Sequence, residues 1–342
     1  MSRVLVTGGA GFIGSHLCEA LLQQDDEVFV VDDLSTGRMD NLRRIQDDQN
    51  FHFVEGSILD FPLLETLTKK VDSIFHLAAA VGVQKIIETP VESIEINVLG
   101  SHNVLTLAAR CKKPCLITST SEVYGKSTKQ PFTEDDDVVY GPTTKSRWSY
   151  AGSKAIDEFL GLAYHQSQKL PIVIARLFNT TGPRQTGRYG MVLPRFVDQA
   201  LRGEPITVFG SGRQSRCFAD VSDVVRGLLL LADHPGAAGQ VFNIGNPEEI
   251  SIGDLAKLVK KQTRSASEIR LIPYDEAYQP GFEDMERRVP NITKVSRLGY
   301  APKIKLKEII GRVIASKQQE LEPVEMPVTM GLPDPLRAGV AE

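Results

Sequence analysis

The sequence predicts an α/β protein with a doubly wound parallel sheet and a smaller C-terminal lobe. Short apolar runs, each about the length of a buried strand, recur along the first half of the chain, and most are separated by segments long enough for a crossover helix. These runs are residues 3–7, 28–31, 52–54, 73–78, 115–118 and 172–177. Residues 14–24 carry apolar side chains at helical spacing soon after the first run. Strands that alternate with helices in this way form a parallel sheet with helices on both faces.

Beyond residue 177 the strand pattern gives way to loops rich in Gly, Pro and Arg, with helical patterns between them. The predicted helices are 194–203, 221–232, 252–262 and 305–319. We therefore expect residues 1–177 to form the first domain, with the chain returning to it near 217–245, and residues 178–320 to form most of the smaller lobe. Residues 321–342 contain four prolines and no periodicity, so we expect an extended tail there.

Composition and charge argue against several classes of protein. Of 342 residues, 42% are hydrophobic and 24% are charged, which is typical of a folded globular protein. The formal net charge of -4 gives no support for a nucleic-acid or membrane partner. The four cysteines form no C-x-x-C pair and have no histidines at ligand spacing, so we expect reduced thiols and no metal site. No leader and no run of about 18 apolar residues is apparent, so we expect a cytoplasmic protein.

A glycine-rich turn follows the first predicted strand. Residues 7–14 read TGGAGFIG, and glycines there permit a tight turn, a close approach of the backbone to a diphosphate, and contact between helix and strand. Asp32 ends the next predicted strand, 18 residues after Gly14, where a carboxylate can bind the ribose hydroxyls of an adenosine. The two features together predict a Rossmann domain that binds a dinucleotide. The charge of Asp32 would repel the 2′-phosphate of NADP, which favours NAD, although Arg38 could offset that repulsion.

A tyrosine and a lysine in the first domain have the spacing of an acid-base pair. Tyr150 and Lys154 are four residues apart, so a helix brings both side chains to one face. A tyrosine has an ordinary pKa of about 10, which must fall by roughly two to three units for it to act as a base near neutrality. A neighbouring ammonium and a positively charged nicotinamide ring can lower it. A cluster of hydroxyl residues at 119–121 ends a predicted strand and completes the candidate site.

The glycine turn, Asp32, the segment YAGSK at 150–154 and the segment STSEVYG at 119–125 together resemble the extended short-chain dehydrogenase/reductase superfamily. Within it, residues 3–312 look like the nucleotide-sugar epimerases, dehydratases and decarboxylases. The resemblance implies a bound NAD that is reduced and reoxidised within one turnover. It also implies a UDP-linked or similar nucleotide-sugar substrate held by the C-terminal lobe, and a homodimer formed by a pair of helices from each subunit.

The resemblance also implies residue roles. Thr120 would hydrogen-bond the reacting hydroxyl and Ser121 could share its proton, beside Glu122, Tyr150 and Lys154 as further catalytic residues. The implied cofactor-binding residues are Gly8, Gly11, Phe12, Ile13, Asp32, Ser35, Thr36, Gly37, Ser57, Ile58, Leu77, Ala78, Ala79, Asn97, Tyr150 and Lys154. The implied substrate-binding residues are Asn179, Arg184, Arg188, Val192, Arg195, Arg216 and Arg288. Where relatives often carry Gly-Asp beside the adenine, this chain has Gly56-Ser57, so adenine binding would rest on backbone contacts and Ile58.

Two reactions stay open at this point. The dehydratases carry Asp-Glu at positions 121–122, and Ser121-Glu122 disfavours that reaction but resembles decarboxylases of glucuronate-type sugars. The loop at 182–191 resembles that of UDP-hexose and UDP-hexuronate 4-epimerases, while 209–216 resembles the diphosphate clamp of the family. We therefore expect a 4-epimerase of UDP-glucuronate or a UDP-hexose that works through a 4-keto sugar, with a UDP-glucuronate decarboxylase giving a UDP-pentose as the alternative. A non-catalytic dinucleotide-binding regulator is a weaker alternative, because Tyr150 and Lys154 are both present.

Overall fold

The computed structural model describes residues 1–81, 88–187, 191–277, 285 and 287–321. Arg188 and the predicted tail beyond Leu321 lie outside these residues. A seven-stranded sheet in the order β11-β6-β5-β4-β1-β2-β3 forms the centre of the larger lobe, and all its strand pairs are parallel. The strands are β1 Arg3–Thr7, β2 Glu27–Asp32, β3 Phe51–Glu55, β4 Ser73–His76, β5 Cys115–Thr120, β6 Ile172–Leu177 and β11 Gln240–Ile244.

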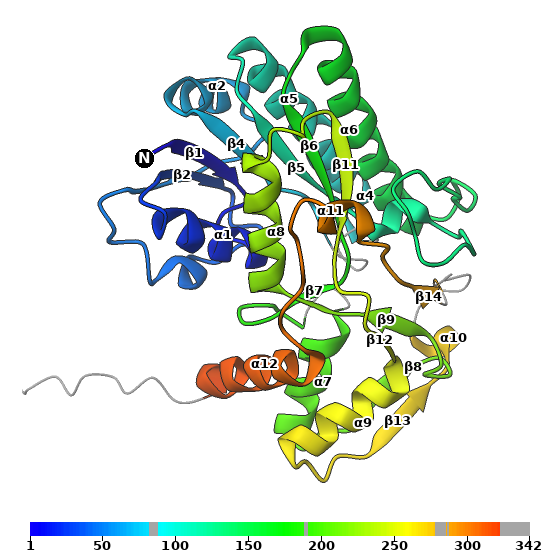
Figure 1. Ribbon diagram of the computed structural model, residues 1–342. Helices are drawn as coiled ribbons and strands as arrows, with labels where there is room; N and C mark the ends of the chain where they lie inside the picture. Colours follow the sequence, from blue (N-terminus) through cyan, green and yellow to red (C-terminus); the bar gives the residue numbers. More distant parts are fainter. Residues whose placement is uncertain (82–87, 188–190, 278–284, 286, 322–342) are drawn as a thin grey trace, which may run out of the picture.

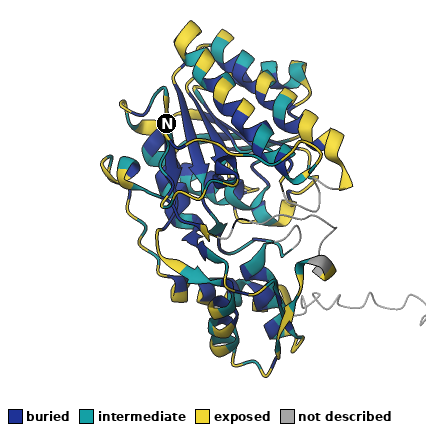
Figure 2. Ribbon diagram, turned by 90° about the vertical axis from the view of Figure 1, so that its right-hand side faces the viewer, coloured by how far each residue is buried: buried dark blue, intermediate teal, exposed yellow. Residues whose placement is uncertain are grey.

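Helices cover both faces of this sheet, as the alternating pattern predicts (Figure 1). Side chains alternate between the faces, so Val4 and Val6 pack in one apolar core with Leu17 and Leu228, while Leu5 packs in the other. The helices of the larger lobe are α1 Phe12–Leu22, η1 Met39–Leu42, α2 Phe61–Lys70, α4 Pro90–Glu95, η2 Ile96–Gly100, α5 Ser101–Arg110, η3 Ser121–Tyr124, α6 Arg147–Gln168, α8 Val221–Asp233 and α11 Thr293–Ser296. Figure 2 shows the strands buried between helices whose outer sides are exposed. The Rossmann-like fold is therefore confirmed.

The smaller lobe packs three helices against short strands around an apolar core of its own. Its helices are α7 Val192–Leu201, α9 Ile252–Thr263, α12 Leu306–Leu321 and the short α10 Tyr274–Ala277, and its strands are β8 Ile206–Phe209, β9 Ser215–Cys217, β12 Glu249–Ser251, β13 Ile269–Ile272 and β14 Arg287–Arg288. The two-stranded pair β7 Thr180–Thr181 and β10 Ala219–Asp220 lies between the lobes. Helix α12 includes Leu321, the first residue of the predicted tail. No helix in the described ranges is long and apolar enough to cross a membrane.

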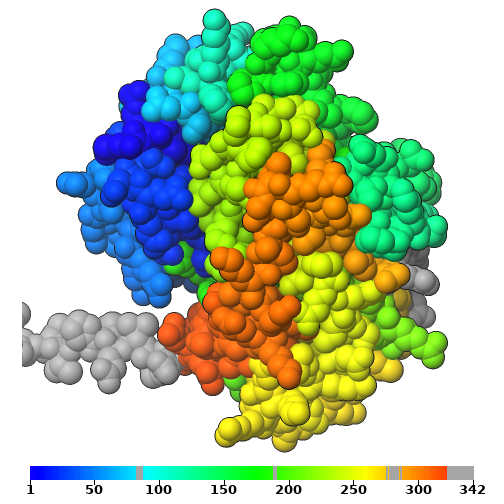
Figure 3. All heavy atoms as spheres, viewed as in Figure 1, coloured from blue at the N-terminus to red at the C-terminus, as the bar shows by residue number. Residues whose placement is uncertain are grey.

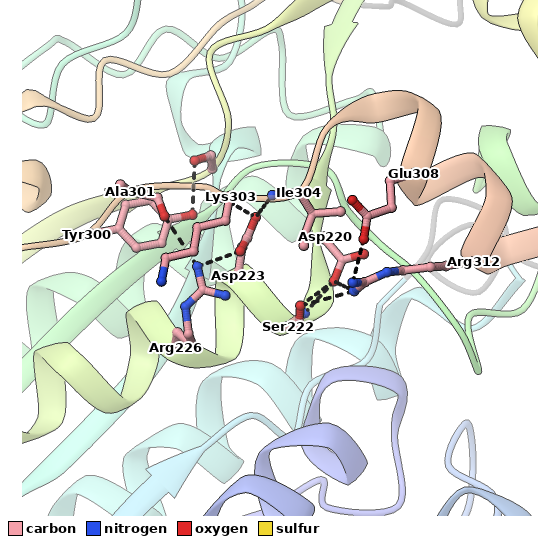
Figure 4. A network of polar contacts seen from close by, with 11 residues as sticks. Asp220, Ser222, Asp223, Arg226, Tyr300, Ala301, Lys303, Ile304, Glu308 and Arg312 are labelled. Carbon is pink, nitrogen blue, oxygen red and sulfur yellow. Dashed lines mark hydrogen bonds and ion pairs between the residues drawn. The ribbon is translucent and has the colours of Figure 1, made fainter.

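Polar contacts tie the C-terminal part of the chain to α8 (Figure 4). Asp220 caps the start of α8 and pairs with Arg312 of α12 at 3.1 Å. Asp223 of α8 accepts hydrogen bonds from the backbone N–H groups of Lys303 and Ile304 at 2.8 and 2.9 Å. In the space-filling view the orange C-terminal segment lies against the yellow-green α8 and continues onto the smaller lobe (Figure 3). These contacts fix the smaller lobe relative to the sheet.

Candidate active site

A cleft of about 2050 Å³ lies between the lobes, at the carboxyl ends of the sheet strands. Most predicted site residues from both lobes line it. They are Gly8, Gly11, Phe12, Ile13, Asp32, Thr36, Leu77, Ala78, Ala79, Thr120, Ser121, Glu122, Tyr150, Lys154, Asn179, Arg184, Val192, Arg195, Arg216 and Arg288. Ser35, Gly37, Ser57, Ile58 and Asn97 do not line it. Within the described residues, no group of His, Cys, Asp and Glu side chains is arranged to hold a metal ion.

The glycine turn leaves room for a diphosphate at the start of α1. Gly8 has a φ of +73°, and a Cβ there would lie 2.7 Å from the backbone nitrogen of Ala78. A Cβ at Gly14 would lie 2.1 Å from the carbonyl oxygen of Gly8. Helix α1 begins without a side-chain cap or an acidic residue in its first turn, so its backbone N–H groups remain for an anion. The residues present therefore fit the diphosphate of NAD.

The Asp32 carboxylate is held at the end of β2 by backbone N–H groups. It accepts from Ala10 and from Leu34, both at 2.9 Å. Burial raises the pKa of Asp32, and these two hydrogen bonds act against that rise. A Cβ at Gly37 would lie 2.6 Å from the carboxylate, so a larger residue at position 37 would clash with Asp32. Arg38 pairs with Asp40 at 3.1 Å on the surface.

Three of the residues expected to bind the cofactor make contacts within the protein, and their roles at the cofactor stay predictions. Ile58 is buried in the apolar core, where its side chain fills the space over Gly100. The Ser57 hydroxyl accepts a hydrogen bond from the backbone N–H of Leu59 in the same loop. Asn97 is buried in the π-helical turn η2, where it accepts from Ala80 N–H at 2.8 Å and donates to Ser153 at 3.2 Å. Asn97 therefore fixes the loop after β4 against α6.

Tyr150 and Lys154 lie on one face of α6, as predicted, but their electrostatics differ from the expectation. Burial raises the pKa of Tyr150, the Glu122 carboxylate adds to the rise, and a hydrogen bond with Thr120 lowers it. The Lys154 ammonium is buried and pairs with Asp157 at 2.8 Å. The protein's own groups do not give the expected lowering of the Tyr150 pKa, because burial raises it and the Glu122 and Asp157 carboxylates add to the rise. Sequence reasoning missed Asp157, although it lies one helical turn beyond Lys154.

A charged cluster lies beside Tyr150 and Thr120. Glu122 pairs with Arg288 of β14 at 2.6 Å and with Arg147 of α6 at 3.4 Å, and both arginine side chains are 9% exposed. The backbone N–H of Glu122 donates to Thr120 Oγ1 at 3.2 Å, which places the carboxylate at the end of β5. Arg288, which was expected at the diphosphate, therefore lies at the end of the cleft that holds Tyr150 and Thr120. Arg147 was not predicted, although it lies three residues before Tyr150 on the same helix.

The other basic and polar residues of the smaller lobe are held in different ways. Arg216 of β9 lies beside Arg288 in strand register and donates to the carbonyl of Ser215 at 2.7 Å. Arg184 reaches α1, where it donates to Ser15 at 3.1 Å and pairs with Glu19, so it bridges the lobes. The remaining two residues are fixed within the smaller lobe or at its edge: the Arg195 guanidinium lies 4.0 Å from the ring centre of Phe209, and Asn179 donates to the carbonyl of Cys217 at 3.0 Å.

Comparison with known proteins matches the same region of the chain. Residues 5–313 match the family model of GDP-mannose 4,6 dehydratase. The chain is 42% identical to UDP-N-acetyl-alpha-D-glucosaminuronate decarboxylase of Bacillus cytotoxicus over 86% of this chain and 91% of that protein. It is 38% identical to UDP-glucuronic acid decarboxylase 4 of Arabidopsis thaliana over 93% of this chain and 69% of that protein.

Solved structures of related enzymes share the whole architecture. UDP-glucuronic acid 4-epimerase from Bacillus cereus, in complex with UDP-glucuronic acid and NAD, matches with a TM-score of 0.83 and 29% identity over 93% of this chain and 99% of that chain. UDP-glucose 4-epimerase from Thermotoga maritima matches with a TM-score of 0.84 and 31% identity over 94% of this chain and 100% of that chain. The protein therefore belongs to the GDP-mannose 4,6-dehydratase family of the extended short-chain dehydrogenases/reductases, whose members are NAD-dependent enzymes of nucleotide-sugar epimerisation, dehydration and decarboxylation.

Proposed function

We propose that the protein is a decarboxylase of a UDP-linked hexuronate of the glucuronate type, which loses carbon dioxide from C6 and leaves a UDP-linked pentose. The observation that carries the proposal is the ion pair between Glu122 and Arg288 beside Tyr150 and Thr120. The decarboxylase names of its relatives at 42% and 38% identity support the same reaction. The sequence of the loop at 182–191 favoured the 4-epimerase over the decarboxylase. The ion pair and the names of the relatives lead us to prefer the decarboxylase instead.

The residues of the chain supply the proton transfers of this reaction. Thr120 hydrogen-bonds the C4 hydroxyl, and Tyr150 takes its proton as general base. Bound NAD supplies the reversible oxidation at C4. The resulting ketone is β to the C6 carboxylate, so the bond between C5 and C6 breaks, carbon dioxide leaves, and the electron pair remains on C5 as an enolate. A water held by Glu122 and Arg288 would give C5 a proton and regain one from solvent, and Tyr150 returns its proton to the C4 oxygen when the oxidation at C4 is reversed.

The charged cluster suits decarboxylation better than epimerisation. A 4-epimerase must let the keto sugar turn over in the site, and that step needs no ionisable group beyond Tyr150. A decarboxylase must instead hold the sugar carboxylate in one alignment and deliver a proton to C5. Arg288 offers a planar guanidinium for such a carboxylate, and Glu122 fixes its orientation from the other side.

Product analysis tests the proposal. The protein, loaded with NAD, is incubated with UDP-glucuronate labelled at C6 and, separately, with UDP-N-acetylglucosaminuronate, with Tyr150→Phe as the inactive control. We expect labelled carbon dioxide at the rate of substrate loss, and a UDP-pentose from at least one of the two sugars. UDP-galacturonate formed without loss of mass would instead support the 4-epimerase and overturn the decarboxylase. If the protein turned over no UDP-sugar, the result would favour the alternative of a non-catalytic dinucleotide-binding regulator.

We also infer that the protein forms a homodimer through α4, η2 and α6. Large apolar side chains on these neighbouring helices are exposed, including Val91 at 68% and Phe159 at 70%. Leu99 at 51% and Ile156 at 45% lie on the same group of helices. An apolar surface of this kind is typical of a protein interface. The helix pair implied by the family resemblance would cover it with its copy from a second subunit.

A further inference from the structure

A connected set of buried polar side chains lies under the cleft, in the otherwise apolar layer between the sheet and α6. It consists of Thr7 of β1, His76 of β4, Ser101 of α5, and Lys154 and Asp157 of α6, and each is at most 2% exposed. Thr7 Oγ1 lies 2.7 Å from His76 Nδ1, and His76 Nε2 lies 3.0 Å from Ser101 Oγ. The Lys154 ammonium donates to Asp157 at 2.8 Å. We call these five residues the buried polar chain.

The hydrogen bonds of the buried polar chain run in one direction. Thr7 Oγ1 accepts the N–H of Ala78 at 3.2 Å, which leaves its own proton for His76 Nδ1. Burial, with the nearby Lys154 ammonium, lowers the pKa of His76 to about 3, so the ring is neutral and carries its proton on Nε2. That proton is donated to Ser101, whose hydroxyl lies against Asp157. The series therefore ends on the Asp157 carboxyl. Burial raises the pKa of Asp157, and the Lys154 ammonium and the Ser101 hydroxyl act against that rise.

Asp157 also lies where its charge acts on the catalytic residues. It is three residues beyond Lys154 and seven beyond Tyr150, so all three side chains share one face of α6. Its negative charge contributes to raising the pKa of Tyr150. The other charged or titratable groups around this face are Glu122 of η3, Arg147 and Glu158 of α6, Arg176 of β6, His76 of β4 and Arg288 of β14.

Most of those other charges already have close partners of opposite sign. Glu122 pairs with Arg288, and Glu158 pairs with Arg176 at 2.7 Å. Removing the charge of Asp157 would therefore take away a negative charge that raises the pKa of Tyr150 and leave the Lys154 ammonium without its ion-pair partner at 2.8 Å. We propose that Asp157 is a positioning residue that anchors the Lys154 ammonium and restrains the ionisation of Tyr150, and so sets the pH at which Tyr150 begins to act as a base.

The first test measures Tyr150 itself and needs no substrate. The NAD-loaded protein carries carbon-13-labelled tyrosine, and the Tyr150 resonance is assigned by its loss in Tyr150→Phe. Asp157→Asn removes the charge but keeps an oxygen acceptor for Lys154. We expect Tyr150 to titrate at lower pH in this variant, with on the order of tenfold more phenolate at a given pH. Asp157→Ser, which also lacks the charge, should show the same direction and serves if the asparagine variant does not fold.

Asp223→Asn is the matched control. Asp223 is likewise buried on a helix and pairs with an arginine three residues along, Arg226, but it faces the smaller lobe and not the cleft. Its substitution should affect thermal stability without moving the Tyr150 titration. An unchanged Tyr150 titration in both Asp157 variants, or an equal shift in Asp223→Asn, would overturn the proposal and leave Asp157 as a structural counter-ion of Lys154.

The second test depends on the proposed function and is read separately. If the protein turns over UDP-glucuronate, the acidic limb of its kcat/KM profile should move to lower pH in Asp157→Asn and stay in place in Asp223→Asn. If the unsubstituted protein turns over no UDP-sugar, the proposed function fails while the Tyr150 titration still decides the role of Asp157. If turnover is found and neither the titration nor the acidic limb moves, only the role of Asp157 fails.

Discussion

Replacing Glu122 by glutamine tests the step that distinguishes the two reactions. Glutamine keeps an oxygen that can accept from Arg288 at the observed 2.6 Å, so the cluster can keep its shape. It loses the negative charge that, in the proposed mechanism, orders a proton-delivering water beside two arginines of 9% exposure. Positioned proton transfer contributes about 100-fold or more, so we expect kcat for decarboxylation to fall by about 100-fold, or about 2.7 kcal/mol of transition-state free energy.

The same substitution has a pH consequence of known sign. The Glu122 carboxylate raises the pKa of Tyr150, so its removal favours the phenolate. The acidic limb of kcat/KM should therefore move to lower pH even as kcat falls. A loss of kcat without that movement would mean that the variant has changed the shape of the site rather than its charge.

The chain contains a control for this experiment, because Arg287, the residue before Arg288 on β14, also pairs with a glutamate. Glu249 pairs with Arg287 at 2.7 Å, outside the cleft, just as Glu122 pairs with Arg288 inside it. The assay compares the steady-state release of labelled carbon dioxide by Glu122→Gln and Glu249→Gln under saturating substrate. We expect Glu249→Gln to match the unsubstituted protein. If Glu122→Gln also keeps kcat within about threefold, the assignment of C5 protonation to this cluster is wrong.

Three further changes probe the cofactor, the substrate and the interface. Asp32→Ala should weaken NAD binding by about tenfold or more and reduce discrimination against NADP in calorimetric titrations, and equal affinities before and after would contradict its ribose role. Arg216→Ala should raise KM by about tenfold with little change in kcat, because a diphosphate contact is made in ground and transition states alike; a collapsed kcat at unchanged KM would argue against it. Phe159→Glu should give a monomer in sedimentation experiments with NAD still bound, and an unchanged sedimentation coefficient would exclude α6 from the interface.

The fold follows closely from the sequence because its strands are short apolar runs at regular intervals. The strand missing from those runs is β11, whose Gln240, Val241, Phe242, Asn243 and Ile244 mix polar and apolar residues. Asn243 is nevertheless buried, because its side chain accepts from the Tyr124 hydroxyl at 2.6 Å. The spacing of residues along a short segment cannot reveal a partner that lies 119 residues away in the sequence. The sequence therefore predicted that the chain returns to the sheet in this region, but not which residues form the strand.

The sequence indicated candidate site residues where a residue type, at its spacing from its neighbours, is commonly used for one kind of chemistry. The glycines, Asp32 and the Tyr150/Lys154 pair are of that kind. In the sequence, Asp157 and Arg147 look like ordinary solvent-exposed charged residues on an amphipathic helix. Only the structure shows that their side chains are largely buried. Arg184 shows the converse, because an arginine in a glycine-rich loop suggests a ligand contact, yet it pairs with Glu19 of α1.

Two neighbouring arginines explain why local sequence could not separate the two reactions. Arg287 and Arg288 form β14, and alternation along a strand turns the first outward to Glu249 and the second inward to Glu122. A shift of one residue in the pairing of β14 with Arg216 of β9 would exchange them. Under the proposed function, the chemistry at Tyr150 therefore depends on the register of a two-residue strand in the smaller lobe. That register is set by pairing between residues far apart in the sequence. Local motifs therefore identify the family, but they do not show how the two lobes meet around Tyr150.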